Sequence, residues 1–227
     1  MFLICGSGRS GTSAVARLLH EAGITMGRDL IEADESNAEG YFEERAVVEM
    51  NDVILRDAGL GSWFATASRE RVLEAAHLHG EAMRALAAEA TPGWKDPRFS
   101  WTLEAWMEVL PERPRLIVCL RSPAEVVAST LRYYGLEPGE ASRAVEHTWR
   151  CEYERLLEII DAYVLDAICV EYGQLVADPD AAIAPLERFV GRALGGAGVR
   201  RDLKHHAALV PAEFRELYAR VAALGKA

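Results

Sequence analysis

The sequence predicts an α/β fold, a three-layer sandwich in which helices cover both faces of a mainly parallel central sheet. The chain opens with an apolar run of strand length at residues 2–5, a glycine-rich turn, and an amphipathic helical pattern at residues 14–22. An apolar run at residues 115–120, and a strand and turn within residues 166–175, are each followed by a further helical pattern. Strands that alternate with helices favour a parallel sheet, and 227 residues suit a single domain spanning 1–227.

Composition narrows the classes of ligand and location. The net charge is −10, so DNA and RNA are not expected partners, and an anionic ligand has to be held by a local cluster of Arg and Lys. No apolar run approaches the roughly 20 residues of a membrane span, and the first run is already used as a strand. The four cysteines, Cys5, Cys119, Cys151 and Cys169, show no C-x-x-C spacing and are typical of core residues in a reducing compartment. We therefore expect a cytoplasmic protein.

The glycine-rich turn, GSGRSGTS, predicts a phosphate-binding loop. Glycines let the backbone approach an anion, and the positive end of the following helix dipole points the same way. Gly6, Gly11 and Ser13 fit the spacing of the ATPase loop G-x-x-x-x-G-K-[ST]. The lysine of that loop is replaced by Thr12, and the cation stands three residues earlier, at Arg9. A bound nucleotide would therefore meet its cation at a different point along its phosphates.

Two later strands each end in a basic residue. The segment before the Asp96 and Pro97 turn predicts a short strand that delivers Lys95 at its carboxyl end, where ligands of open α/β sheets bind. The alternative is a solvated charged turn. The strand at residues 115–120 delivers Arg121, whose guanidinium fork matches a phosphate.

The segment after Arg121 predicts a well-defined helix start. Ser122 suits the N-cap, Pro123 suits the first helical position, and Glu125 completes a capping box. Ser129 then returns to the face that Ser122 and Glu125 occupy, where its hydroxyl can contact the same phosphate.

These motifs resemble those of sulfotransferases that use 3′-phosphoadenosine-5′-phosphosulfate (PAPS). R-S-G-T-S at residues 9–13, directly after an N-terminal strand, is similar to their 5′-phosphosulfate loop. R-x-P-x-x-V-x-x-S at residues 121–129 is similar to their 3′-phosphate signature, and K-D-P-R at residues 95–98 resembles their lysine segment. The resemblance covers residues 2 to about 180 and implies the P-loop NTPase-like sulfotransferase fold.

The resemblance also implies roles for individual residues. Arg9 would offset charge on the leaving oxygen, and Lys95 would stabilise the sulfuryl oxygens. Asp96 and Arg98 would either support Lys95 or contact the substrate. No metal is required. The residues expected to bind the donor, and its product adenosine 3′,5′-bisphosphate (PAP), are Gly8, Arg9, Ser10, Gly11, Thr12, Ser13, Arg121 and Ser129.

The candidate general base is Glu43. Family members carry a catalytic carboxylate after the first helix, and here Glu43 and Glu44 follow the aromatic pair Tyr41 and Phe42. Desolvation by such neighbours raises the pKa of a carboxyl group toward the working pH. The alternative is that both glutamates only stabilise a helix N-terminus.

The predicted reaction is transfer of the sulfuryl group from PAPS to a hydroxyl or amine of a small-molecule, glycan or lipid acceptor. The sequence does not identify the acceptor, whose pocket we expect the loops at residues 28–40 and 59–67 to shape. Two alternatives stay open. One is a P-loop kinase that uses ATP and Mg²⁺, with Glu171 as its acidic strand end, and the other is a nucleotide-binding protein without catalysis.

Two further expectations concern helices and the C-terminus. Residues 69–90 predict one long helix. Residues 191–227 begin with a glycine-rich stretch, followed by the basic cluster at residues 200–206, and are a candidate mobile segment that covers the nucleotide. A solvated basic face is the alternative for that cluster.

Overall fold

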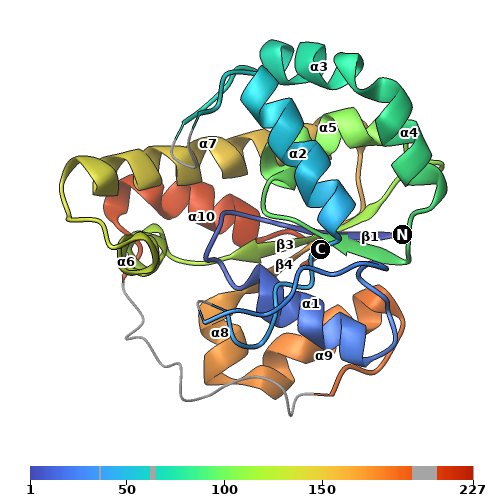
Figure 1. Ribbon diagram of the computed structural model, residues 1–227. Coiled ribbons are helices and arrows are strands. Elements are labelled where there is room, and N and C mark those ends of the chain that lie inside the picture. Colours follow the sequence, from blue (N-terminus) through green and yellow to red (C-terminus); the bar gives the residue numbers. More distant parts are fainter. Residues whose placement is uncertain (36, 62–64, 196–208, 227) are drawn as a thin grey trace.

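The computed structural model describes residues 1–35, 37–61, 65–195 and 209–226. Its centre is a four-stranded sheet in the order β2-β1-β3-β4, in which every pair of neighbours is parallel (Figure 1). The strands are β1 (Phe2–Cys5), β2 (Gly93–Lys95), β3 (Arg115–Leu120) and β4 (Ala167–Glu171). The predicted α/β fold with a parallel sheet is therefore confirmed.

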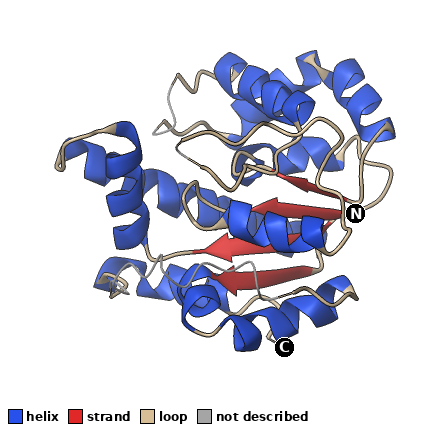
Figure 2. Ribbon diagram, turned by 60° about the horizontal axis from the view of Figure 1, so that its bottom comes forward, coloured by secondary structure: helices blue, strands red, loops and turns tan. Residues whose placement is uncertain are grey.

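Helices cover both faces of the sheet, as Figures 1 and 2 show. One face carries α1 (Thr12–Glu21), α8 (Tyr172–Ala177) and α9 (Pro179–Val190). The other carries α2 (Arg45–Asp57), α3 (Arg69–Leu78), α4 (Gly80–Ala88), α5 (Phe99–Met107), α7 (Glu140–Tyr163) and, after the 3₁₀ turn Ala212–Phe214, α10 (Arg215–Ala222). Helix α6 (Pro123–Tyr134) leaves the carboxyl end of β3.

The alternation of strand side chains divides the core in two. Ile4 and Ile117 pack on the α1 and α9 side of the sheet, whereas Leu3, Leu116 and Val118 pack on the side of α2, α5 and α7. Because both faces are covered, both sets of side chains are apolar and fully buried. This explains why the strands read as continuous apolar runs in the sequence.

The long helix predicted over residues 69–90 is instead two helices, α3 and α4. The chain turns at His79, whose backbone leaves helical geometry at φ −109° and ψ 10°. Gly80 follows directly, and glycine has a low helix propensity. The ring of His79 lies 2.7 Å from Asp57 Oδ2 on α2, so a tertiary contact holds the break.

The start of α6 lies where the sequence predicts it, but the capping box is wrong. Ser122 is the N-cap residue and Pro123 follows, yet the Ser122 hydroxyl has no hydrogen-bond partner within the described part of the chain. Glu125 turns toward the cation that precedes the helix, with its Oε2 3.6 Å from Arg121 Nε. Gly135 ends the helix in the left-handed region at φ 63°, as expected for a residue at that position.

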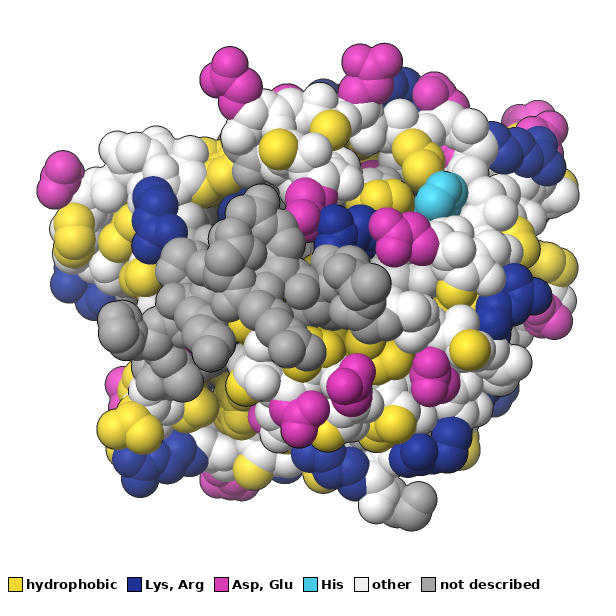
Figure 3. All heavy atoms as spheres, turned by 90° about the horizontal axis from the view of Figure 1, so that it is seen from below, with side chains coloured by type: hydrophobic (Ala, Val, Ile, Leu, Met, Phe, Trp, Pro, Cys, Tyr) yellow, Lys and Arg dark blue, Asp and Glu magenta, His cyan; other side chains and the backbone are white. Residues whose placement is uncertain are grey.

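The structure also bears on the expectations for the cysteines, for membrane spans and for the basic cluster. All four cysteines are free. Of the helices in the described ranges, none has the length and apolarity needed to cross a bilayer. The basic cluster at residues 200–206 lies outside the described residues. On the face in Figure 3, acidic and basic side chains of the described residues are interspersed.

Candidate functional site

A cavity of about 620 Å³ opens at the carboxyl ends of the strands. It is lined by the loop after β1, by Lys95 at the end of β2, by Arg121 just after β3 and by Tyr172 just after β4. The carboxyl ends of parallel strands meet at one edge, which is where ligands of open α/β sheets bind. The fold therefore brings together the basic residues that the sequence singled out.

The glycine-rich loop has the backbone of an anion-binding turn. Gly6 has φ 129°, and a Cβ there would lie 2.3 Å from the carbonyl oxygen of Cys119. Gly11, at φ 90°, is the N-cap of α1, and no side chain caps this helix. Gly8, Arg9, Thr12 and Ser13 line the cavity with Gly11. The first N–H groups of α1 are thus left for a ligand at the cavity edge.

Tyr153 on α7 holds the loop from behind. Its hydroxyl donates to the carbonyl of Cys119 at 2.6 Å, accepts from the backbone N–H of Ser7 at 3.3 Å, and lies 3.2 Å from Ser10 Oγ. Ser10 is fully buried and, unlike its neighbours, is not among the lining residues of the cavity. The hydroxyl of Ser10 therefore anchors the loop to α7.

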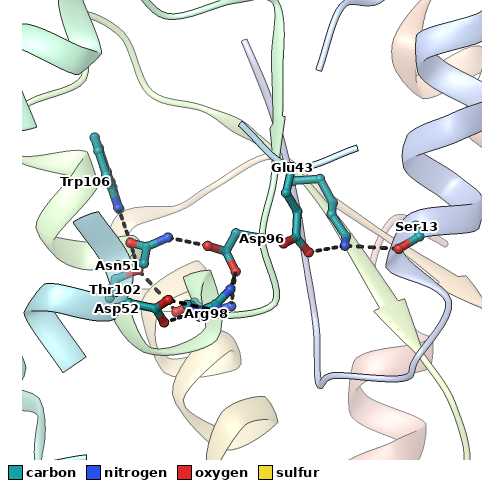
Figure 4. Close-up of polar contacts among 9 residues, drawn as sticks. Ser13, Glu43, Asn51, Asp52, Asp96, Arg98, Thr102 and Trp106 are labelled. Atoms are coloured by element: carbon teal, nitrogen blue, oxygen red, sulfur yellow. Dashed lines mark hydrogen bonds and ion pairs between the residues drawn. The ribbon is translucent and has the colours of Figure 1, made fainter. Parts of the chain in front are cut away.

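Lys95 joins the loop to the candidate base. Its Nζ donates to Ser13 Oγ at 3.1 Å and to Glu43 Oε1 at 2.5 Å (Figure 4). Lys95 and Glu43 are both buried, with exposures of 2% and 7%. Burial raises the pKa of Glu43, and the ammonium of Lys95 offsets part of that rise. The pair places a carboxylate and a cation next to the loop, at the wall of the cavity.

A second buried network fixes the turn that follows Lys95 (Figure 4). Asp96 is fully buried and accepts hydrogen bonds from Asn51 Nδ2 at 2.8 Å and from Arg98 at 3.0 Å. Arg98 also reaches Asp52 on α2 at 2.5 Å. Asp96 and Arg98 therefore support the position of Lys95 by tying its strand end to α2, and Arg98 also lines the cavity.

Replacing Asn51 by leucine is expected to destabilise the protein by about 3 kcal/mol or more, because it removes partners from three buried groups. The Oδ1 of Asn51 accepts from Thr102 at 2.8 Å and from the Trp106 indole at 2.7 Å, besides the bond to Asp96. Urea unfolding measures the change. Replacing Glu49 by leucine, at an exposed position on the same helix, should change the free energy of unfolding little. An equal loss in both variants would contradict this role of Asn51.

Arg121 and Arg9 link the two sequence motifs. Arg121 donates from NH1 to the backbone carbonyl of Arg9 at 3.1 Å, and its guanidinium stacks over Tyr172 at 4.7 Å. Its Nε is buried and has no hydrogen-bond partner among the described residues. Arg9 donates to Ser129 Oγ at 3.3 Å and lies over the ring of Tyr133. Both arginines therefore meet at one side of the cavity.

The loops that were expected to shape the acceptor pocket contribute unequally. Ile31, Asp34 and Asn37, from residues 28–40, line the cavity, and Asn37 Nδ2 donates to Ser13 Oγ at 3.3 Å. Residues 62–64 lie outside the described residues, and the described part of 59–67 contributes no lining residue.

Two further residues, Thr148 and Glu152 on α7, line the cavity and were not predicted from the sequence. Both are buried, and the neighbours of Glu152 on this helix, Trp149 and Leu156, belong to the core. The sequence signal that could have identified Glu152 is a charged residue within the apolar stripe of a helix.

Glu171, the acidic strand end that the kinase alternative requires, is engaged elsewhere. Its carboxylate accepts from Tyr218 at 3.1 Å and from Lys226 at 3.2 Å. It is not among the described residues that line the cavity.

Comparisons with known proteins agree with this geometry. A model described as "Sulfotransferase family" matches residues 2–194. A sulfotransferase domain from the Synechococcus PCC 7002 olefin synthase is similar in structure, with a TM-score of 0.53 and 16% identity, over 100% of this chain and 87% of that one. A sulfotransferase domain from the curacin biosynthetic pathway is similar with a TM-score of 0.53 and 14% identity, over 98% and 97%. A search of curated proteins gave no match.

Proposed function

Because the chain belongs to the sulfotransferase family, we propose that it transfers the sulfuryl group of PAPS to a hydroxyl or amine of a small-molecule, glycan or lipid acceptor. The observation that carries this proposal is the convergence of three cations on one cavity. Lys95 ends β2 and Arg121 follows β3, the strands on either side of β1, and Arg9 comes from the loop that follows β1. These cations would bind the 5′-phosphosulfate and the 3′-phosphate of PAPS.

The donor would be held at two points. The uncapped start of α1 and the hydroxyls of Thr12 and Ser13 suit the 5′-phosphosulfate. Arg121, whose buried Nε makes no hydrogen bond among the described residues although Glu125 Oε2 lies 3.6 Å away, and Ser129 suit the 3′-phosphate. The uncapped start of α1 and the Arg121 Nε without a hydrogen bond support the fit of PAPS to the site, since buried polar groups are normally hydrogen-bonded.

When bound, PAPS would supply an activated sulfuryl group. Lys95, Glu43 and Arg9, around the glycine-rich loop, would each have a separate role in its transfer. Lys95 would turn from Ser13 and Glu43 toward the sulfuryl oxygens and stabilise their charge. Glu43 would then accept the proton of the acceptor hydroxyl, a task favoured by the pKa that burial raises. Arg9 would stabilise the oxygen that carries the leaving charge.

The cytoplasm remains the predicted location, supported by four free cysteines. The single domain and the C-terminal cover likewise remain predictions from the sequence.

Calorimetric titration with PAP, beside ATP with Mg²⁺, tests the donor site. Replacing Arg121 by alanine should weaken PAP binding about 10- to 100-fold, since a charge-assisted hydrogen bond contributes about 1.5–3 kcal/mol. Replacing Arg115 by alanine is the matched control. It removes an arginine from the opposite end of β3, where it pairs with Asp166.

Metal-independent binding of PAP that weakens in Arg121→Ala and not in Arg115→Ala would support the proposal. Binding of ATP with Mg²⁺ and no preference for a 3′-phosphate would overturn it in favour of the kinase. Binding of PAP without any turnover of PAPS across an acceptor panel would favour the non-catalytic alternative.

A further inference from the structure

Helix α7 presents a polar pair to the cavity that the donor site does not use. Val145, Thr148 and Glu152 recur at helical spacing and line the cavity together. Thr148 Oγ1 and Glu152 Oε2 are buried and have no hydrogen-bond partner within the described ranges of the chain. The two residues are only 6% and 7% exposed. Buried polar atoms without partners are rare, and two on successive turns at a cavity wall point to a ligand.

The cavity that this pair lines also has apolar lining residues. Val48 on α2 and Val126 on α6 line the same cavity as Val145, so the cavity combines a charged region with an apolar one. The cations assigned to the donor come from the loop and from the ends of β2 and β3, whereas the pair comes from α7. The pair is therefore available to the second substrate.

The carboxyl group of Glu152 is neutral when it contacts a ligand. Burial raises the pKa of its carboxyl group to about 8, and hydrogen bonding with Ser7 and Trp101 offsets only part of the effect. At pH 7 the carboxyl is mostly protonated and donates a hydrogen bond. The Thr148 hydroxyl both donates and accepts. A hydroxyl group, which also does both, complements the pair without forcing Glu152 to ionise.

We propose that Thr148 and Glu152 form a subsite that binds a neutral hydroxyl of the acceptor. The acceptor would then carry two hydroxyls, one that receives the sulfuryl group and one that α7 holds, on a compact apolar body. This inference rests on the proposed function, because it assigns the second substrate of that reaction. Thr148 and Glu152 would be residues that determine specificity.

The first measurement needs no ligand. Replacing Thr148 by valine keeps the volume of the side chain and removes an unpartnered hydroxyl. The melting temperature should therefore stay the same or rise by up to about 2–4 °C. A fall in melting temperature would show that Thr148 is bonded within the protein and would overturn the proposal.

The second measurement uses three probes with PAP present, namely trans-1,2-cyclohexanediol, cyclohexanol and cyclohexylammonium. Chemical shifts of ¹³C-labelled threonine methyl groups report binding, and Thr148→Val assigns the Thr148 signal. In that variant the methyl groups of Thr12 and Thr130, which also line the cavity, report binding. The diol should bind wild type at least about fivefold tighter than cyclohexanol, since a second hydrogen bond contributes about 1 kcal/mol. Thr148→Val and Glu152→Leu should abolish that preference, whereas Glu152→Gln and the exposed control Glu154→Gln should keep it.

Any other pattern counts against the subsite. Equal binding of diol and cyclohexanol, or no binding of any probe, would overturn it. So would a diol preference that survives Thr148→Val. Tightest binding of cyclohexylammonium, lost in Glu152→Gln, would show a cation site instead. Calorimetry with PAP on the same samples separates the two proposals, because an absence of PAP binding would overturn the proposed transfer from PAPS and leave a measured diol preference standing.

Discussion

Replacement of Lys95 by methionine is expected to lower the free energy of unfolding by about 3 kcal/mol at pH 8, because it leaves a buried carboxylate without its cation. Glu43 is 7% exposed and pairs with Lys95 at 2.5 Å. Burial already raises the pKa of Glu43, and without Lys95 it rises further. A carboxyl group whose folded pKa is raised destabilises the protein above its unfolded pKa. The loss should therefore shrink as the pH falls toward 4.5.

The double variant Lys95→Met with Glu43→Gln should recover most of this loss, since no charge is then left unpaired. Lys226→Met is the matched control, because this lysine pairs with Glu171 at 3.2 Å and its side chain is 58% exposed. That pair should contribute less than about 1 kcal/mol. If the double variant were no more stable than Lys95→Met, packing of the lysine stem and not the buried charge would explain the loss.

The single variant Lys95→Met should also affect the binding of PAPS and of PAP differently. The proposed contact of Lys95 is with the sulfuryl oxygens, which PAP lacks. Affinity for PAPS should therefore fall about 10-fold or more, whereas affinity for PAP should change little. Calorimetry with both nucleotides measures the difference, and an equal loss for the two would contradict the assignment of Lys95 to the sulfuryl group.

The sequence predicted the centre of this site because local patterns determine it. An apolar run followed by glycines and a helical pattern defines where β1 ends, and a run ending in Arg121 defines where β3 ends. In a parallel sheet the carboxyl ends of the strands lie at one edge, so the parallel arrangement alone places those two ends together. The meeting of Arg121 with Arg9 is a consequence of topology and not of sequence distance.

The remainder depends on contacts between distant segments. Glu43 contacts Lys95 across a sequence separation of 52 residues, and neither periodicity nor spacing encodes that contact. The break at His79 likewise involves a contact with Asp57 on α2. In each case a tertiary contact overrides a local preference.

Replacement of Glu152 by glutamine is expected to stabilise the protein at pH 8, and the effect should vanish at low pH. The pKa of Glu152 is raised from 4.5 to about 8 in the folded protein. Between these values the unfolded state loses the proton and the folded state keeps it, so wild-type stability falls as the pH rises. At about 1.4 kcal/mol per pH unit, the difference between Glu152→Gln and wild type should grow to as much as about 5 kcal/mol above pH 8.

Urea unfolding at intervals from pH 4 to pH 9 measures this difference, with Glu154→Gln as the control on an exposed position of the same helix. Comparing the variant with wild type at each pH cancels the titration of every other group that the two proteins share. A difference that is constant across the range would show that Glu152 has an ordinary pKa and is solvated. A difference that grows with pH would show that this helix holds a protonated carboxyl at the cavity wall, since only a group that keeps its proton on folding produces that sign.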